Sequence, residues 1–369
     1  MTTTPADARM VAQQFPTTPS SRRARRILGQ WRHPIAQAVL KALLTVFITT
    51  SITFFLIRLM PGNPIDIKID ELTKDGLLTY AEARSQAASL FSIDLDRPLP
   101  EQYLSFIVNL AHGDIGYSFV SQGTPVMAIV LAVLPWTLFS VGTGLLLSFS
   151  VGVFLGLLAA YNRNRPIDHI LSLGGSIISA VPQYFIALLI VIVLGVELRW
   201  LPITSMRGAT SAGIPAGFTP QFVGDVLFHA SLPISVYFLA TLGHWILGMK
   251  SATVNALEED YVNAARARGL SDGRIMTAYV GRNAVLPLVT QLAIAAGLAI
   301  GGSILIEQYF SYQGVGLRLQ AAILQRDYPV MQGILLMVTL AVVIANLLAD
   351  VLYSRLDPRI GRAGGATGS

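Results

Sequence analysis

The chain has 369 residues, of which 53% are hydrophobic and only 13% are charged. A soluble globular domain carries about 25% charged residues, so this composition predicts a membrane protein. The chain has no cysteine, which excludes disulfides and thiolate metal sites. The net charge of +5 does not indicate nucleic-acid binding, because a cluster of arginines precedes the first apolar run, where anionic lipid head groups are the expected partners.

Residues 1–33 are polar and rich in Thr, Ala and Arg, which predicts a disordered basic cytosolic tail. The apolar run that follows, Val39 to Met60, is too long for the core of a cleavable signal peptide. Pro61, Gly62, Asn63 and Pro64 come next, instead of a small-residue cleavage pattern. We therefore expect a first transmembrane helix within residues 34–62.

Six segments have the length and apolar composition of membrane-spanning helices. They lie at about residues 38–60, 127–160, 168–196, 229–249, 285–306 and 330–352. The second segment is longer than one perpendicular span, so it is expected to tilt or protrude, with a kink at Pro135. The sequence thus predicts an all-α polytopic membrane protein whose helical core covers residues 127–356.

The positions of Lys and Arg near the helix ends predict the orientation, because cytoplasmic loops carry an excess of both. Basic residues occur in the N-terminal tail, between the second and third segments, between the fourth and fifth, and after the sixth. These positions alternate correctly across the six segments. We therefore expect both termini in the cytosol, including a C-terminal tail at residues 357–369.

Residues 63–126 then lie on the opposite side, as an acidic external subdomain between helices one and two. Within them, apolar residues close to helical spacing predict one amphipathic helix on the membrane or on the core. These residues are Leu99, Tyr103, Phe106, Ile107 and Leu110. Packing within the chain is the expected role of this helix, and contact with a partner is the alternative.

Signatures of catalysis are missing from the sequence. It has no HExxH zinc pair, no GxxxxGK[ST] loop to hold nucleotide phosphates and no GxSxG elbow. The histidines are scattered without ligand spacing: His33, His112, His169, His229 and His244. We expect no catalytic, cofactor or metal site in this chain, and interfacial polar roles for His229 and His244 near the ends of the fourth segment.

The connection between the fourth and fifth segments, residues 258–274, has a local pattern of its own. The acidic run Glu258–Asp260 favours a helix N-terminus, and Gly269 suits the left-handed position that closes a helix. Ser271 or Asp272 can then cap a second helix. The pattern predicts a helix, a tight turn and a second helix.

Small side chains at Ala264, Ala265 and Ala267 would let a partner approach this first helix closely. Tyr261 and Leu270 would offer the partner apolar anchors. An ordinary amphipathic helix at the membrane interface explains the same pattern equally well.

Residues 258–274 resemble the permease coupling loop of binding-protein-dependent ABC importers, the EAA loop. Asn263-Ala264-Ala265 followed by Gly269 fits its E-A-A-x-x-x-G frame, with Asn263 in place of the glutamate. Asp260-Tyr261-Val262 before an Ala-Arg-Ala-Arg-Gly-Leu run is similar to the dipeptide and oligopeptide branch, and Arg282 to Pro287 continues that similarity.

Further short stretches of similarity, called islands below, extend the resemblance from about Ala38 to Gly361. The evidence for the resemblance is that these islands share their order along the chain with the family. They are residues 55–64, 113–118, 134–138, 179–185, 326–330 and 356–359, together with Asp350. The long external segment after the first helix is similar to the B-type subunit of this branch.

The resemblance implies an ABC importer type I permease fold with six transmembrane helices in the bacterial inner membrane. It implies a permease subunit, not an enzyme, that converts ATPase closure into alternating access for di- or oligopeptides. The implied partners are a second permease subunit, one or two ATPase subunits that hold ATP and Mg, an extracytoplasmic substrate-binding protein, peptide and membrane lipid. The ATPase-coupling residues it implies are Asp260, Tyr261, Ala264, Ala265, Arg268, Gly269, Leu270 and Arg274.

Other functions remain open at this point. The same branch includes importers of nickel, glutathione, haem and some sugars. An ion-coupled secondary transporter usually carries ionisable groups at the membrane midplane. Residues 131–158, 170–195 and 331–349 contain no Asp, Glu, Lys or Arg, which argues against that mechanism. A membrane scaffold without transport activity is the remaining alternative.

Overall fold

The computed structural model describes residues 34–59, 69–70, 72–74, 78–91, 98–121, 123–302 and 304–356. Across these ranges the chain is mainly helical, and β structure is limited to one isolated bridge between Tyr117 and Pro125. The chain divides into two compact units, Met1–Leu44 and Thr45–Ser369, and the packing discussed below lies within the second. The predicted tails at residues 1–33 and 357–369 lie outside the described residues.

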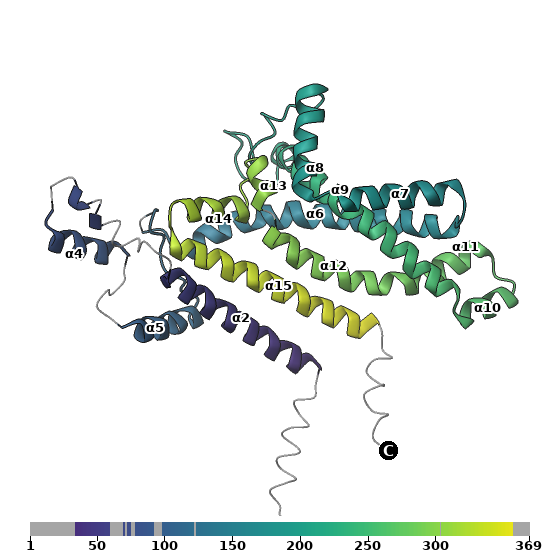
Figure 1. Ribbon diagram of the computed structural model, residues 1–369, viewed down its shortest axis with the longest axis horizontal. Coiled ribbons are helices and arrows are strands. Elements are labelled where there is room, and N and C mark those ends of the chain that lie inside the picture. The colour runs from purple at the N-terminus through teal and green to yellow at the C-terminus, as the bar shows by residue number, and fades with distance from the viewer. Residues whose placement is uncertain are drawn as a thin grey trace, which may run out of the picture. The chain divides into compact units, whose positions relative to one another are not determined.

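Long apolar helices confirm the predicted all-α membrane fold. Four of them are long and apolar enough to cross a membrane: α2 (Pro34–Leu59), α6 (Val126–Tyr161), α9 (Pro220–Leu257) and α15 (Tyr328–Leu356). The helix α12 (Arg282–Gly302) covers most of the fifth predicted segment. Figure 1 shows α6 beside α9 and α12 beside α15, with α7 (Pro166–Ala180) against α9. The count of six spans stays a prediction.

The third predicted segment is bent in the structure. The helix α7 ends at Ala180, and α8 (Gln183–Leu189) continues into a π-helix, η2 (Ile190–Glu197), at 99° to α7. Val181 has an extended backbone, with φ −88° and ψ 120°. The following Pro182 explains the break, because the residue before a proline avoids the helical region and proline has no N–H to donate. In contrast, α6 continues through Pro135.

The pair α6 and α9 packs through two rows of residues spaced four apart. The α6 row is small: Gly144, Ser148, Gly152 and Gly156. The facing α9 row is Tyr237, Thr241, Trp245 and Met249. Residues four apart lie on one helix face, so each row forms a ridge along its helix.

The approach of these two ridges leaves no room for larger side chains on α6. A Cβ atom at Gly152 would lie 2.4 Å from the Cβ of Trp245, and one at Gly144 would lie 2.6 Å from the Cβ of Tyr237. Between them, Thr241 donates its hydroxyl hydrogen to the Ser148 hydroxyl at 2.8 Å. Small residues let membrane helices approach closely where the lipid supplies no hydrophobic driving force.

The predicted external segment contains α4 (Tyr80–Phe91) and α5 (Leu99–Ala111). A capping box starts α4, because the Thr79 N–H and hydroxyl both donate to the Glu82 carboxylate, at 2.9 and 2.7 Å. Both hydrogen bonds lower the pKa of Glu82, and the bond from the Thr79 N–H has the larger effect. The short helix α4 thus starts on a local sequence signal.

One face of α5 packs against α2. The Phe106 ring stacks on Phe54 with centroids 5.1 Å apart, and the Tyr103 hydroxyl lies 2.6 Å from the Ser51 hydroxyl. Phe54 is buried by these contacts. The amphipathic helix predicted around residues 99–110 is therefore present and packs within the chain, whereas Leu104 and Val108 stay exposed.

Two sequence islands that are far apart in the chain meet at the start of α15. The buried Asp327 carboxylate accepts the Ser118 hydroxyl hydrogen and the Phe119 N–H, the latter at 3.0 Å. Residues 113–118 and 326–330 are both islands of the family resemblance. The structure gives their pairing a physical reason, because this carboxylate satisfies the backbone of the loop before α6.

We predict that Gly152→Ala lowers the thermal stability of the purified protein, because its Cβ would collide with Trp245. We expect a loss of about 1–3 kcal/mol. Gly142→Ala is the matched control, because a Cβ at Gly142 on the same helix meets no atom within 4 Å. Size-exclusion chromatography after heating measures both variants, and equal melting temperatures would contradict this account of the α6–α9 contact.

Candidate functional site

The segment at residues 258–274 folds as its sequence predicts. The helix α10 runs from Asp260 to Ala267, directly after α9, and a short turn leads to α11 (Asp272–Arg274). Asp260 lies in the first turn of α10 and Arg266 in the last, which complements the helix dipole. Ser271 precedes α11 as expected, but its side chain makes no capping hydrogen bond.

A Schellman motif closes α10 at Gly269. The Gly269 N–H donates to the Arg266 carbonyl at 2.9 Å, and the Leu270 N–H donates to the Ala265 carbonyl at 3.3 Å. Gly269 has φ +74°, the left-handed region that glycine enters without a steric penalty. The tight turn predicted from this glycine is therefore present.

The inner face of the segment forms a small apolar core. Val262 and Ala265 of α10 are buried there, with Ala265 only 3% exposed. They pack with residues of the next helical stretch: Ile275, Met276 and Val280. Partly buried neighbours complete the core: Leu157 of α6, Ala256 and Leu257 of α9, Tyr261 and Leu270.

The predicted site residues therefore separate into two groups. The exposed group is Asp260, Ala264, Arg268, Gly269 and Arg274. The inward group is Tyr261, Ala265 and Leu270, which pack on the core of the segment itself. The structure corrects the expectation that Ala265 offers a partner a small, open surface, because the C-terminal turn of α10 faces inward at this residue.

The segment is joined directly to the long helices that it follows and precedes. A π-helix, η3 (Ile275–Gly281), connects it to α12 without a loop. Leu157 and Ala256 belong both to its core and to a second cluster around Trp245, Met249 and Leu288. A π-helical turn often occurs at functional sites. A displacement of α10 would thus press on α6, α9 and α12 together.

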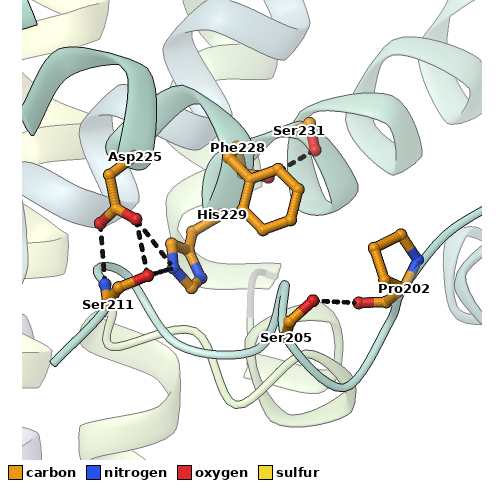
Figure 2. Close-up of polar contacts among 7 residues, drawn as sticks. All are labelled: Pro202, Ser205, Ser211, Asp225, Phe228, His229 and Ser231. Carbon is orange, nitrogen blue, oxygen red and sulfur yellow. Dashed lines mark hydrogen bonds and ion pairs between the residues drawn. The ribbon is translucent and has the colours of Figure 1, made fainter. Parts of the chain in front are cut away.

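At the opposite end of α9, a polar clamp holds the connection between η2 and α9. The Asp225 carboxylate accepts the N–H and the hydroxyl hydrogen of Ser211, each at 2.7 Å. The His229 Nε2 lies 3.0 Å from the Ser211 oxygen and 3.5 Å from Asp225 (Figure 2). Figure 2 also shows that Asp225 and His229 project from one helix toward the loop that carries Ser211.

This Ser, His and Asp combination is not arranged as a catalytic triad. Both contacts of His229 use the same nitrogen, and its buried Nδ1 has no partner among the described residues. In a triad the carboxylate orients the histidine through the second nitrogen. The contacts instead tie the loop at Ser211 to one turn of α9. The partners of His229 could not be read from the sequence.

A buried carboxylate accepts several hydrogen bonds at the end of the core that also contains Ser211 and His229. Glu307 of α13 (Ile304–Tyr309) accepts the Thr137 hydroxyl hydrogen at 2.6 Å and the Gly316 N–H at 2.7 Å. Gly316 lies in the first turn of α14 (Val315–Leu324), where free N–H groups favour an anion. Burial, with the Glu307 charge nearby, raises the pKa of Tyr312, so its hydroxyl stays neutral.

Comparison with known proteins gives the segment its family context. Residues 152–362 match the family described as binding-protein-dependent transport system inner membrane component. The oligopeptide transport system permease protein AppB of Bacillus subtilis is 30% identical over 84% of this chain and 93% of its own length. The di/tripeptide transport system permease protein DppB of Pseudomonas aeruginosa is 33% identical over 86% and 95%.

The chain belongs to this family of inner membrane transport components. The predicted resemblance is thus confirmed, and so is the prediction of a multi-pass membrane permease. The matched range includes residues 258–274, the whole apolar core under α10, and all of the cluster around Trp245 except Phe149.

We predict that Gly269→Val destabilises the turn after α10, because a β-branched residue resists positive φ. The expected loss is about 1–3 kcal/mol locally. Gly273→Val is the control, since Gly273 has no positive φ and its Cβ position is open. Limited proteolysis should cut the segment faster in Gly269→Val than in Gly273→Val; equal cleavage rates would show that the turn does not need glycine.

Proposed function

We propose that this chain is the transmembrane permease subunit of an ATP-driven importer of di- or oligopeptides. The names of AppB and DppB support the cargo class, because each describes peptide transport and each relative aligns over most of its length. Nickel, glutathione, haem and sugar remain the alternative cargoes. A cluster of His, Cys, Asp or Glu that could hold a metal is absent from the described residues, which gives a nickel site in this chain no support.

The main support for ATPase coupling is that residues 258–274 have one exposed face and one buried face. An exposed face with small and charged residues lies on an apolar core that is fixed to three long helices. We assign ATPase contact to the exposed group, in particular Ala264 and Arg268. Tyr261, Ala265 and Leu270 act as positioning residues that hold this face in shape.

A continuous series of packed side chains supports the transmission of an ATPase movement from this face to the long helices. The core under α10 shares Leu157 and Ala256 with the cluster around Trp245. That cluster shares Leu292 with the core that contains Tyr237, Phe310 and Tyr312. Packed side chains with few voids transmit displacement rather than absorb it. The path therefore offers a physical route, which coupling measurements must test.

The proposed assembly contains a second permease subunit, one or two ATPase subunits and an extracytoplasmic substrate-binding protein. ATP and Mg belong to the ATPase partners, and peptide and lipid are the other expected contacts. We place both termini and α10 in the cytosol on the distribution of Lys and Arg. The Ser211 clamp and residues 63–126 then face outward, where the acidic external segment is a candidate surface for the binding protein.

The proposal predicts that substitutions at two neighbouring alanines abolish uptake for different reasons. Ala264→Trp should leave the purified chain folded but block close approach of the ATPase, because Ala264 is exposed. Ala265→Trp should instead unfold the segment, because no space exists for an indole in its apolar core. The measurement is ATP-dependent uptake of a labelled tripeptide into proteoliposomes containing the whole transporter, together with the melting temperature of each variant.

The expected result is loss of uptake in both variants, with a lowered melting temperature only for Ala265→Trp. Normal uptake and ATPase retention with Ala264→Trp would reject ATPase coupling through this face. Wild-type uptake that is absent for tripeptides but present for another solute would reject only the cargo assignment.

A further inference from the structure

A cleft of about 390 Å³ lies where the turn between α6 and α7 meets α9. The apolar residues Leu247 and Val254 line it together with seven polar or charged residues: Arg163, Asn164, Asp168, His169, Lys250, Ser251 and Asn255. Lys250 follows directly after Met249, the last residue of the apolar run of α9. The cleft therefore lies at the boundary between apolar and polar chain, where a membrane protein meets lipid head groups.

The only carboxylate in the lining is already satisfied within the protein. Asp168 accepts a hydrogen bond from Lys250 Nζ at 2.5 Å and one from the Ser172 hydroxyl at 3.1 Å. The Asn164 N–H donates to its other oxygen at 3.1 Å. Asp168 is buried by these contacts. Its negative charge is thus neutralised by the ion pair with Lys250.

Positive charge remains in the lining once this pair is formed. The side chains of Arg163 and His169 are exposed and make no hydrogen bond or ion pair with another described residue. Lys250 also lines the cleft, and its ammonium donates to Ser172 and Asp168. The cleft thus combines two free basic side chains with a neutralised pair. This combination favours binding of an anion with several acceptor oxygens.

An unpartnered apolar row runs from the cleft along α7. Ile170, Leu173 and Ile177 are 69%, 64% and 58% exposed. His169, Leu173 and Ile177 are spaced four apart, so the basic cleft and the apolar row share one helix ridge. The row from His169 to Ile177 is about 12 Å long at 1.5 Å per residue, close to one leaflet of a hydrocarbon core about 30 Å thick.

We propose that this cleft binds the phosphate of an anionic phospholipid whose acyl chain lies along the apolar row of α7. Arg163 and His169 contact the phosphate, and Ile170, Leu173 and Ile177 contact the chain. A soluble anion would use the cleft and leave the apolar row bare, whereas a phospholipid matches both in the observed order. The inference does not depend on the cargo or on ATPase coupling.

Native mass spectrometry of the full-length chain in mild detergent tests the proposal. Phosphatidylglycerol and phosphatidylcholine with the same acyl chains are added in equal amounts. We expect the wild type to retain phosphatidylglycerol preferentially. The double variant Arg163→Gln/His169→Gln should lose this preference by about fivefold, because one Lys or Arg near an anionic lipid surface contributes about 1 kcal/mol and the variant removes one arginine. Size-exclusion profiles verify that each variant stays folded.

Three further variants sharpen the test. Arg165→Gln removes an exposed arginine that does not line the cleft, so it should keep the preference. Arg163→Lys should keep most of it, because the positive charge remains. Leu173→Ser should weaken retention of both lipids, because it removes chain contact and leaves the phosphate contact intact.

Four outcomes would overturn the proposal. The first is equal retention of the two lipids by the wild type. The second is an unchanged preference in Arg163→Gln/His169→Gln. The third is displacement of the lipid by soluble glycerol phosphate, which would assign the cleft to a free anion. Loss of the ATPase partner from the double variant, with lipid preference intact, would assign the cleft to protein contact and equally contradict the proposal.

Discussion

The close approach of α6 and α9 is the contact on which the rest of the structure depends. Gly152 and Gly156 bring the α6 backbone against Trp245 and Met249, so neither helix can move far without the other. At one end of the pair, Leu157 and Ala256 become part of the core under α10. At the other end, Thr137 of α6 reaches the buried Glu307 carboxylate. A single rigid pair therefore connects two ends of the protein that carry different polar structures.

The candidate coupling helix α10 depends on this pair for its stability. With 8 residues it is shorter than the roughly 12–15 residues at which an isolated helix becomes even marginally stable in water. Val262 and Ala265 supply the missing stabilisation by burial, and Gly269 fixes the exit of the chain. The outward face can then remain small and polar, because the inward face holds the helix. A partner pressing on Ala264 would meet a helix that transmits force into α6 and α9.

Local sequence signals predicted much of the fold. Contacts between residues that are distant in the sequence could not be predicted in this way. The turn at Gly269 and the helix of Tyr103 and Phe106 follow from nearby residues, and both are present. The bend before Pro182 was not predicted. Val181 precedes a proline, but so does Leu134, where α6 continues, so this local signal alone does not decide where a helix breaks. The inward face of Ala265 was not readable, because a short run of alanines has no apolar periodicity. The pairing of Ser118 with Asp327 joins residues 209 positions apart, and no local pattern predicts it.

The central claim is that the exposed face of α10, and not its buried face, receives the ATPase. The natural absence of cysteine allows single thiols to test it directly. Ala264→Cys and Ala265→Cys are introduced separately, each together with one cysteine on the facing surface of the ATPase. Membranes that contain the whole transporter are then treated with a short reagent that joins two thiols. The account predicts a crosslink to the ATPase from position 264 and little or none from position 265. Equal crosslinking from both positions, or from neither, would contradict it.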